Sequence, residues 1–294
     1  MTYPRMIFRR ALFALIALAL LLVASIGGFI ILLVSVDWPA WHVGGYQRQV
    51  DAGAGDIAAA TTDAARAVGH IQRGRGHAEM ARYRQVFKSV GAAEYASLYE
   101  TAMLDLDAAV RLDPENVEAY NARGLTYFER SWAAGQNGLE PEAATKAWLA
   151  RAKADFTVII DRDARNATAL DYRGMTNENL GDYSAAIDDY TRVSALDATL
   201  GALRLADVYC RRGGTWIAQK AYDKAVADLE RSISLGANRD GCDCDPYSSL
   251  LWTYFEGLGD FDKSWTLVHK AQSERRWLMP ELVEKLKAAS LRNS

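Results

Sequence analysis

The feature that most constrains this 294-residue chain is an apolar run near its N-terminus. Residues 11–36 contain no charge and are dominated by Leu, Ile, Ala, Val and Phe. At ~1.5 Å of rise per residue, a helix of this length reaches roughly 39 Å, whereas the hydrocarbon layer of a bilayer is about 30 Å thick. We therefore expect one transmembrane helix over residues 11–36, preceded by a basic cytoplasmic N-terminus over residues 1–10.

A cleaved signal peptide is the alternative, because Arg5, Arg9 and Arg10 form a basic segment before the run. Signal peptides have apolar cores of only about 7 to 15 residues, followed by a small-x-small cleavage site. Here the core is longer, and a segment containing Asp, Trp and Pro follows it. The pattern favours a retained anchor that contacts membrane lipid through this helix.

The orientation of the span follows from nearby basic residues, which are retained on the cytoplasmic side of a membrane. Three arginines precede the run, and Arg48 is the only Lys or Arg in residues 37–56. We predict a single-pass inner (plasma) membrane protein whose N-terminus is cytoplasmic and whose remaining chain is extracytoplasmic. That compartment is the periplasm if the Ala-rich composition reflects a bacterial source.

Composition and motifs exclude several function classes. The net charge of -3 argues against a nucleic-acid partner. The sequence contains no Walker loop, no H-E-x-x-H, no G-x-S-x-G and no Cys-x-x-Cys. We therefore predict that the protein is not an enzyme, and we expect no cofactor, no metal site and no catalytic residues.

One local cluster, at residues 240–245, gives an alternative, because it combines Cys242 and Cys244 with three aspartates. Three interpretations are open: a metal site, a tight disulfide between these two cysteines, or an acidic loop between helices. A metal-dependent or redox protein that uses this loop is the alternative function. We do not expect a bridge from Cys210 to the loop, because Cys210 would lie more than about 10 Å along its helix from the point where the loop arrives.

The segment after the run, residues 37–93, is expected to hold a tether and membrane-proximal helices. Residues 37–55 contain several glycines without sustained periodicity, which is typical of a tether. Apolar residues recur at helical spacing over residues 56–73, and Gly74 and Gly76 are expected to end that helix. Several arginines follow within residues 66–88, and they indicate either attraction to anionic lipid or a solvated helix face.

From about residue 94 onward, apolar-periodic segments of helical length alternate with turn signals. They resemble tetratricopeptide (TPR) repeats, which are helical hairpins of about 34 residues. The sets that match the first helix are Tyr120, Arg123, Gly124 and Tyr127; Leu170, Arg173, Gly174 and Asn177; Leu205, Ala206 and Tyr209; and Leu251, Trp252 and Phe255. Those that match the second helix are Ala102, Leu106, Ala109 and Pro114; Ala152, Phe156 and Ile159; Ala186 and Tyr190; Tyr222, Ala225 and Leu229; and Ser264, Val268 and Ala271.

This resemblance implies an all-α, TPR-like helical-hairpin solenoid over residues 94–277, with about four to five repeats, preceded by the transmembrane helix. Residues 278–294 are expected to form a C-terminal capping helix, with Leu282 and Leu286 along one side. The spacing between copies exceeds the ~34-residue period at residues 131–150 and 212–221. These insertions are either a projecting binding edge or elongated helices.

The resemblance further implies a membrane-anchored adaptor or scaffold whose partner is a protein or peptide. In this family the partner lies in a concave groove made by the first helix of each hairpin. The groove residues expected by analogy are Asn121, Leu125, Phe128, Asp171, Met175, Glu178, Arg204, Asp207 and Arg211. Some family members bind a C-terminal carboxylate with a clamp of basic residues in this groove. The acidic residues among the expected positions weaken such a clamp, so a different ligand is expected.

Overall fold

The structure, a computed structural model, describes residues 38–86, 92–137, 140–236 and 244–293. Every regular element within these ranges is helical, which confirms the all-α class for them. The helices are α3 (Trp38–Ala59), α4 (Asp63–Val86), α5 (Ala92–Leu112), α6 (Val117–Asn137), α7 (Glu142–Arg162), α8 (Ala167–Asn179), α9 (Tyr183–Leu196), α10 (Ala198–Ala218), α11 (Tyr222–Ser234), α12 (Pro246–Trp252), the π-helix η2 (Thr253–Gly257), α13 (Phe261–Ser273) and α14 (Pro280–Asn293).

The expected cytoplasmic segment and transmembrane helix, residues 1–36, lie outside the described residues. Among the helices within the described ranges, none is both long enough and apolar enough to cross a bilayer. These helices form two compact units, an N-terminal unit that ends at Leu180 and a C-terminal unit that begins at Gly181.

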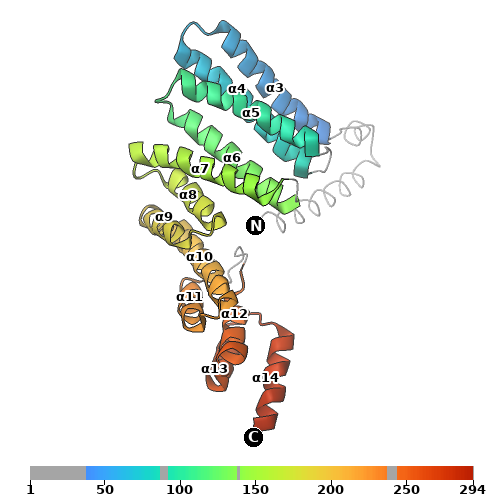
Figure 1. Cartoon of the computed structure of the whole chain (residues 1–294), viewed down its shortest axis with the longest axis vertical. Helices are drawn as coiled ribbons and strands as arrows, with labels where there is room; N and C mark the ends of the chain where they lie inside the picture. Colours follow the sequence, from blue (N-terminus) through green and yellow to red (C-terminus); the bar gives the residue numbers. More distant parts are fainter. Residues whose placement is uncertain (1–37, 87–91, 138–139, 237–243, 294) are drawn as a thin grey trace, which may run out of the picture. The chain divides into compact units, whose positions relative to one another are not determined.

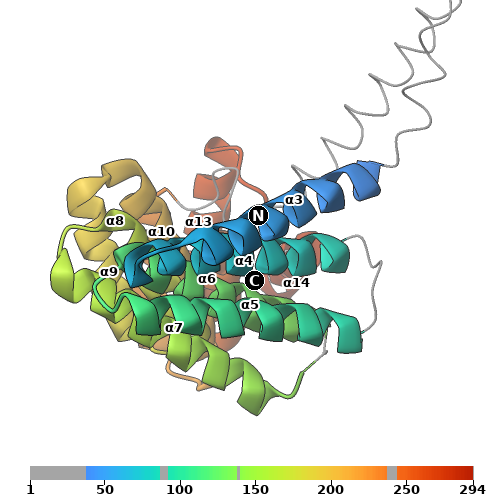
Figure 2. The ribbon, with the colours of Figure 1, turned by 90° about the horizontal axis from the view of Figure 1, so that it is seen from above.

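The helices of the N-terminal unit alternate between two layers. The first layer, called here the first-helix layer, contains α4, α6 and α8, of which α6 contacts both α4 and α8. α5 and α7 pack against this layer as the second helices of hairpins, and α3 packs along α4 (Figure 1). Viewed from above, α3, α4 and α5 lie side by side with similar axis directions (Figure 2).

Glycines in the first-helix layer determine how closely the hairpins pack. A Cβ atom at Gly74 of α4 would lie 2.8 Å from Cγ of Leu106 on α5. A Cβ atom at Gly124 of α6 would lie 3.1 Å from the ring of Phe156 on α7. Because only glycine leaves this space empty, the second helix approaches the first at both positions. Ala102 and Ala152, both fully buried, face the same contacts from the second helices.

Two predictions for residues 37–93 were wrong. The expected tether is helical, since α3 begins at Trp38, and the expected helix over residues 56–73 is divided between α3 and α4. Gly76 does not end a helix but lies inside α4, where an added Cβ would be 2.7 Å from the side chain of Val50 on α3. Sequence alone cannot distinguish a glycine that breaks a helix from one that lets two helices touch.

Two helices, α9 and α13, begin with the same three-residue signal, Gly-Asp-aromatic. Gly181 and Gly259 have positive φ angles of 81° and 67°, which glycine adopts without strain. The next residue, Asp182 or Asp260, accepts a hydrogen bond from the backbone N–H three residues later and caps the helix. This signal explains why α9 and α13 begin where the repeat pattern predicts.

The first expected insertion, at residues 131–150, consists of elongated helices. α6 extends to Asn137 and α7 begins at Glu142, so both helices of this hairpin are longer than α8 and α9. α5 has the same 21 residues as α6 and α7, and α4 has 24. α5, which carries a second-helix motif that lacked a partner in the sequence, therefore has α4 as the first helix of its hairpin.

The second expected insertion rests on a misplaced repeat frame. The first-helix match of Leu205, Ala206 and Tyr209 puts Ala206 at the small position that Gly124 and Gly174 occupy in their copies. In the structure Gly213 occupies it, because a Cβ there would lie 2.8 Å from Cγ of Leu229 and 3.6 Å from the backbone oxygen of Ala225. Ala206 lies two turns earlier on the same side of α10, where its backbone oxygen accepts a hydrogen bond from Ser232. The two positions cannot be told apart by helical periodicity.

The core of the C-terminal unit gathers side chains from α10 through α14. Tyr247, Leu251 and Val268 are almost fully buried within it. The helix expected within residues 278–294 is present as α14, and its Leu282 and Leu286 are buried in the same core.

Candidate functional site

The predicted groove residues of the N-terminal unit lie on α6 and α8. Phe128 and Asp171 are buried, and the Phe128 ring packs edge-on against Tyr172 with 5.7 Å between ring centroids. Phe128 therefore serves the contact between α6 and α8. The remaining four are half-buried and reach the surface of the first-helix layer: Asn121, Leu125, Met175 and Glu178.

Trp132 is a surface residue of α6 that sequence reasoning missed. It lies seven residues after Leu125, so the two share one side of the helix, and it is 51% exposed. The missed signal is this i, i+7 spacing, which was hidden because residue 132 was assigned to an insertion. Leu125 and Trp132 together give the first-helix layer an apolar surface.

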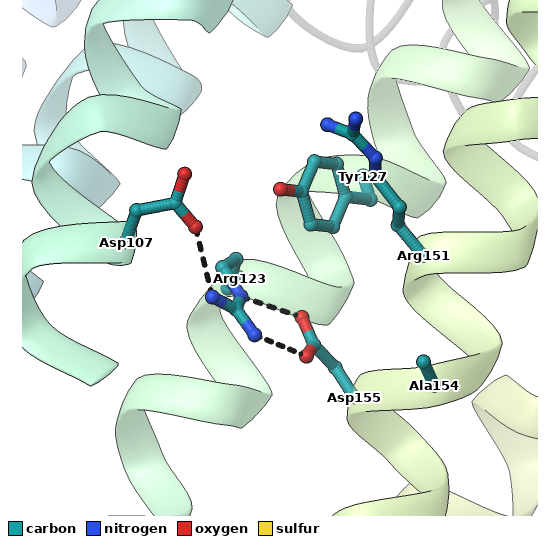
Figure 3. Close-up of a pocket in the computed structure, with 6 residues that line it drawn as sticks. All are labelled: Asp107, Arg123, Tyr127, Arg151, Ala154 and Asp155. Atoms are coloured by element: carbon teal, nitrogen blue, oxygen red, sulfur yellow. Dashed lines mark hydrogen bonds and ion pairs between the residues drawn. The ribbon is translucent and has the colours of Figure 1, made fainter. Parts of the chain in front are cut away.

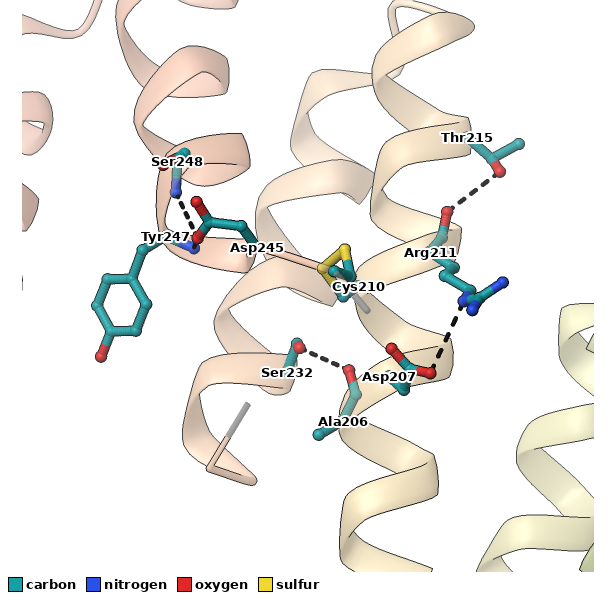
Figure 4. Close-up of a disulfide and its surroundings, with 10 residues drawn as sticks. Ala206, Asp207, Cys210, Arg211, Thr215, Ser232, Asp245, Tyr247 and Ser248 are labelled. Atoms are coloured by element: carbon teal, nitrogen blue, oxygen red, sulfur yellow. Dashed lines mark hydrogen bonds and ion pairs between the residues drawn. A yellow bond between two sulfur atoms is a disulfide. The ribbon is translucent and has the colours of Figure 1, made fainter. Parts of the chain in front are cut away.

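The other three predicted groove residues, Arg204, Asp207 and Arg211, lie on α10 in the C-terminal unit. Arg211 is exposed, and its Nε lies 3.7 Å from a carboxylate oxygen of Asp207 (Figure 4). They belong to the C-terminal unit, whereas the predicted groove residues of α6 and α8 belong to the N-terminal unit.

Buried arginine–aspartate pairs recur within the hairpins. Arg73 donates two hydrogen bonds to Asp105, Arg123 donates two to Asp155, and Arg212 donates two to Asp228. In each pair the arginine precedes a glycine at the helix contact, and the aspartate follows the small residue of the second helix by three positions. The sequence signal is thus an Arg-Gly dipeptide followed by Ala-x-x-Asp.

The Arg123–Asp155 pair forms one wall of a pocket of about 360 Å³ that opens between α5, α6 and α7 (Figure 3). Arg123 also donates a hydrogen bond of 2.8 Å to Asp107 of α5. Burial lowers the pKa of Arg123, but its hydrogen bonds to the two aspartates outweigh burial and raise it. Burial raises the pKa of Asp155, and Arg123 opposes that shift. The complete lining is Asp107, Arg123, Tyr127, Arg151, Ala154 and Asp155.

Arg151, from α7, lies at the same pocket over an aromatic platform, defined as the rings of Tyr127 and Trp148. The two rings are stacked, with centroids 5.8 Å apart and an angle of 10° between their planes. The Arg151 guanidinium lies 5.7 Å from the Tyr127 ring centroid and 5.0 Å from that of Trp148. Burial raises the pKa of Tyr127, so its hydroxyl remains protonated at neutral pH.

A second layer of contacts holds Trp148 in place. Its indole Nε1 donates a hydrogen bond of 2.7 Å to Glu140. Arg130, which is 4% exposed, donates a hydrogen bond of 2.8 Å to the same carboxylate and lies 4.2 Å from the Trp148 ring centroid. The ring is therefore fixed before any ligand arrives.

The cysteines differ from the prediction. Cys210 and Cys244 form a disulfide with 6.1 Å between their Cα atoms, beside the start of α12 (Figure 4). We had expected no bridge from Cys210, because it was placed near the end of its helix. In the structure α10 extends to Ala218, so Cys210 lies further from that end, next to the residues that precede α12. A Cys242–Cys244 disulfide is therefore absent, and Cys242 itself lies outside the described residues.

The remaining chemical interpretations concern metal and lipid. Among the described residues, no group of three or more His, Cys, Asp or Glu side chains is arranged to hold a metal ion. The arginines of α4 are engaged by carboxylates: Arg75 pairs with Glu118, Arg82 with Glu79, and Arg84 with Glu94. These pairs favour the interpretation of a solvated, charge-balanced helix face over a lipid-binding one.

Comparisons with known proteins agree with the helical-repeat interpretation. Residues 98–130 match the family model described as TPR repeat. This segment contains most of α5 and the first part of α6, and the expected TPR resemblance is confirmed there. A search of curated proteins finds no match.

Several solved structures are similar at low identity. BtubC (BKLC) from P. vanneervenii is 17% identical, with a TM-score of 0.49 over 82% of this chain and 92% of that chain. A MamA protein is 21% identical, with a TM-score of 0.38 over 67% and 91% of the two chains. A tetratricopeptide repeat protein from Parabacteroides merdae ATCC 43184 is 14% identical, with a TM-score of 0.38 over 84% and 87%.

Proposed function

We propose that this protein is a membrane-anchored scaffold without catalytic activity, which binds a protein or peptide partner through its helical hairpins. The observation that carries the proposal is the surface of α6, where Leu125 and Trp132 leave apolar area uncovered beside half-buried residues of α8. Exposed aromatic side chains of this kind are common anchors in protein interfaces. The TPR match at residues 98–130 supports a role in protein–protein interaction.

The anchor of the proposed scaffold is the apolar run at residues 11–36. Three arginines before the run and a single one in residues 37–56 favour a cytoplasmic N-terminus and extracytoplasmic hairpins. The Cys210–Cys244 disulfide supports the same compartment, because disulfides persist in oxidising environments and are rare in the cytosol. Since α3 begins at Trp38, the first packed helix starts two residues beyond the run.

Site-specific photo-crosslinking in intact membranes tests the partner-binding surface. A photoreactive phenylalanine analogue at position 132 should give a discrete crosslinked species of higher mass. The same analogue at position 277, where Trp277 is 61% exposed in the C-terminal unit, serves as the control and should not give that species. An identical crosslinking pattern at both positions, or no product from position 132, would remove the support for this surface.

A further inference from the structure

The pocket between α5, α6 and α7 lies on the opposite side of α6 from the proposed partner surface. Arg123 and Tyr127 each stand two residues from Leu125, and two residues of an α-helix turn the side chain by about 200°. A ligand in the pocket would therefore contact the second helices α5 and α7, and would leave Leu125 and Trp132 free. Any function of the pocket is independent of that surface.

The two arginines of the pocket differ in their anionic partners. Arg123 is held on two sides, by Asp155 with hydrogen bonds of 2.9 and 2.7 Å and by Asp107 with one of 2.8 Å. Arg151 is exposed and forms no ion pair with any residue in the described part of the chain. The cation available to a ligand is thus Arg151. Asp107 already accepts a hydrogen bond from Arg123, but its carboxylate is 38% exposed and can pair with a second cation.

Arg151 is also oriented for recognition. Its guanidinium lies over the Tyr127 and Trp148 rings, and Glu140 and Arg130 fix the Trp148 ring from behind. A guanidinium that stacks on aromatic rings presents its N–H groups at its edge. Arg151 uses part of that edge for the Tyr127 hydroxyl, and the remaining N–H groups match the two oxygens of a carboxylate. The protonated hydroxyl of Tyr127 is a further hydrogen-bond donor in the same pocket.

From this arrangement we infer that the pocket is a second docking site, and that it binds a peptide segment in which an acidic side chain is accompanied by a basic one. The acidic side chain pairs with Arg151, and the basic one pairs with Asp107. Because Asp107 repels a second carboxylate, a mixed-charge segment is preferred over a polyacidic one. In an extended peptide the side chains of residues i and i+2 lie on the same face, so a Glu-x-Lys spacing presents both groups together.

Fluorine NMR tests this site on the full-length protein in detergent, labelled with 5-fluorotryptophan. The Trp148 resonance is assigned from the Trp148→Phe variant. The probe is the peptide acetyl-Glu-Gly-Lys-amide, which should shift that resonance in a saturable manner. Acetyl-Gln-Gly-Lys-amide, which lacks the carboxylate, and acetyl-Glu-Gly-Gln-amide, which lacks the ammonium group, should each bind about tenfold more weakly or not at all, since each charge-assisted pair contributes on the order of a factor of ten.

Three variants complete the test. Arg151→Gln should weaken binding of the probe about tenfold, and Ala154→Leu, which fills the pocket, should abolish it. Arg231→Gln, which changes an exposed arginine of α11 in the other unit, should leave binding unchanged. The proposal is overturned if the probe does not shift Trp148 in the unsubstituted protein, or if Arg151→Gln and Ala154→Leu bind it as tightly as Arg231→Gln. Crosslinking from position 132 does not depend on whether the probe binds the pocket. The two experiments therefore test the pocket and the scaffold surface independently.

Discussion

Arg212 of α10 donates two hydrogen bonds, each of 2.7 Å, to the carboxylate of Asp228 on α11. Trp216 donates a third, of 2.9 Å, to the same carboxylate. The pair joins the two helices of one hairpin beside the contact of Gly213 with Leu229. An equivalent pair, Arg123 with Asp155, joins α6 to α7 in the other unit.

Replacing Asp228 by Ala should destabilise the protein markedly. Asp228 is 6% exposed, and its removal leaves Arg212 and Trp216 without their acceptor. Loss of such a hydrogen-bonded buried ion costs about 2–4 kcal/mol of unfolding free energy. Chemical denaturation of the C-terminal unit measures this loss, with Asp223→Ala, an exposed change on the same helix, as the control. Equal stability of the two variants would show that the pair does not hold the hairpin together.

Gly213 and its neighbour Gly214 provide a matched test of helix contact. Gly213→Ala places a methyl group 2.8 Å from Cγ of Leu229 and should cost about 1–3 kcal/mol. Gly214→Ala meets no atom within 4 Å and should stabilise α10 by about 0.5–1 kcal/mol, because alanine favours a helix over glycine. The account predicts opposite signs in thermal unfolding. If both substitutions shift the melting temperature in the same direction, the assigned contact is wrong.

The start of α11 lacks the capping aspartate found at the starts of α9 and α13. A substitution can introduce one. Ala221 has φ -88° and ψ 62°, close to the φ -85° and ψ 68° of the capping residue Asp182, but its side chain cannot accept a hydrogen bond. Ala221→Asp should therefore raise the unfolding free energy by about 1 kcal/mol. Asp260→Ala, which removes an existing cap at α13, should lower it by a similar amount. A destabilising Ala221→Asp would contradict the assigned helix start.

The disulfide can be identified by counting thiols in a variant that lacks Cys242. With three cysteines in the chain, Cys242→Ser should leave no free thiol if Cys210 and Cys244 are bonded, and two if the bond is between Cys242 and Cys244. Mass spectrometry after alkylation under denaturing, non-reducing conditions gives the count. Reduction should also lower stability by about 3–4 kcal/mol, the value expected for a bridge that spans 34 residues.

Features of the fold that depend on short sequence signals could be predicted. Gly181-Asp182-Tyr183 marks the start of α9, where Gly181 has a positive φ and Asp182 caps the helix. Ala186, predicted as a small residue of this helix, is fully buried. The length of α3 and α4 could not be predicted in this way. Gly53, Gly69, Gly74 and Gly76 lie at contacts with another helix, and those contacts are absent from the local sequence.

Predictions for the candidate sites depended on the repeat frame. On α6 the frame places Gly124 correctly at the contact with Phe156. Asn121 and Leu125 are half-buried there, Phe128 is buried, and partner binding by these residues stays a prediction. On α10 the predicted frame was displaced by two turns. Ala206 is a small residue, and it lies on the same side of the helix as Gly213, so the two positions were confused. The platform at Arg151 was missed because Tyr127 and Trp148 come from two elongated helices whose pairing has no short-range signal.

The most direct test of the whole account is the membrane topology of the hairpins, because the anchor, the disulfide and the partner all depend on the compartment. Alkaline phosphatase and a fluorescent protein that folds only in the cytoplasm are fused in turn to the C-terminus after Ser294, in bacterial cells. We predict an active phosphatase fusion, a dark fluorescent fusion, and hairpins that are degraded when protease is added to opened cells. An inactive phosphatase with a bright fluorescent fusion would place the hairpins in the cytoplasm and contradict the account.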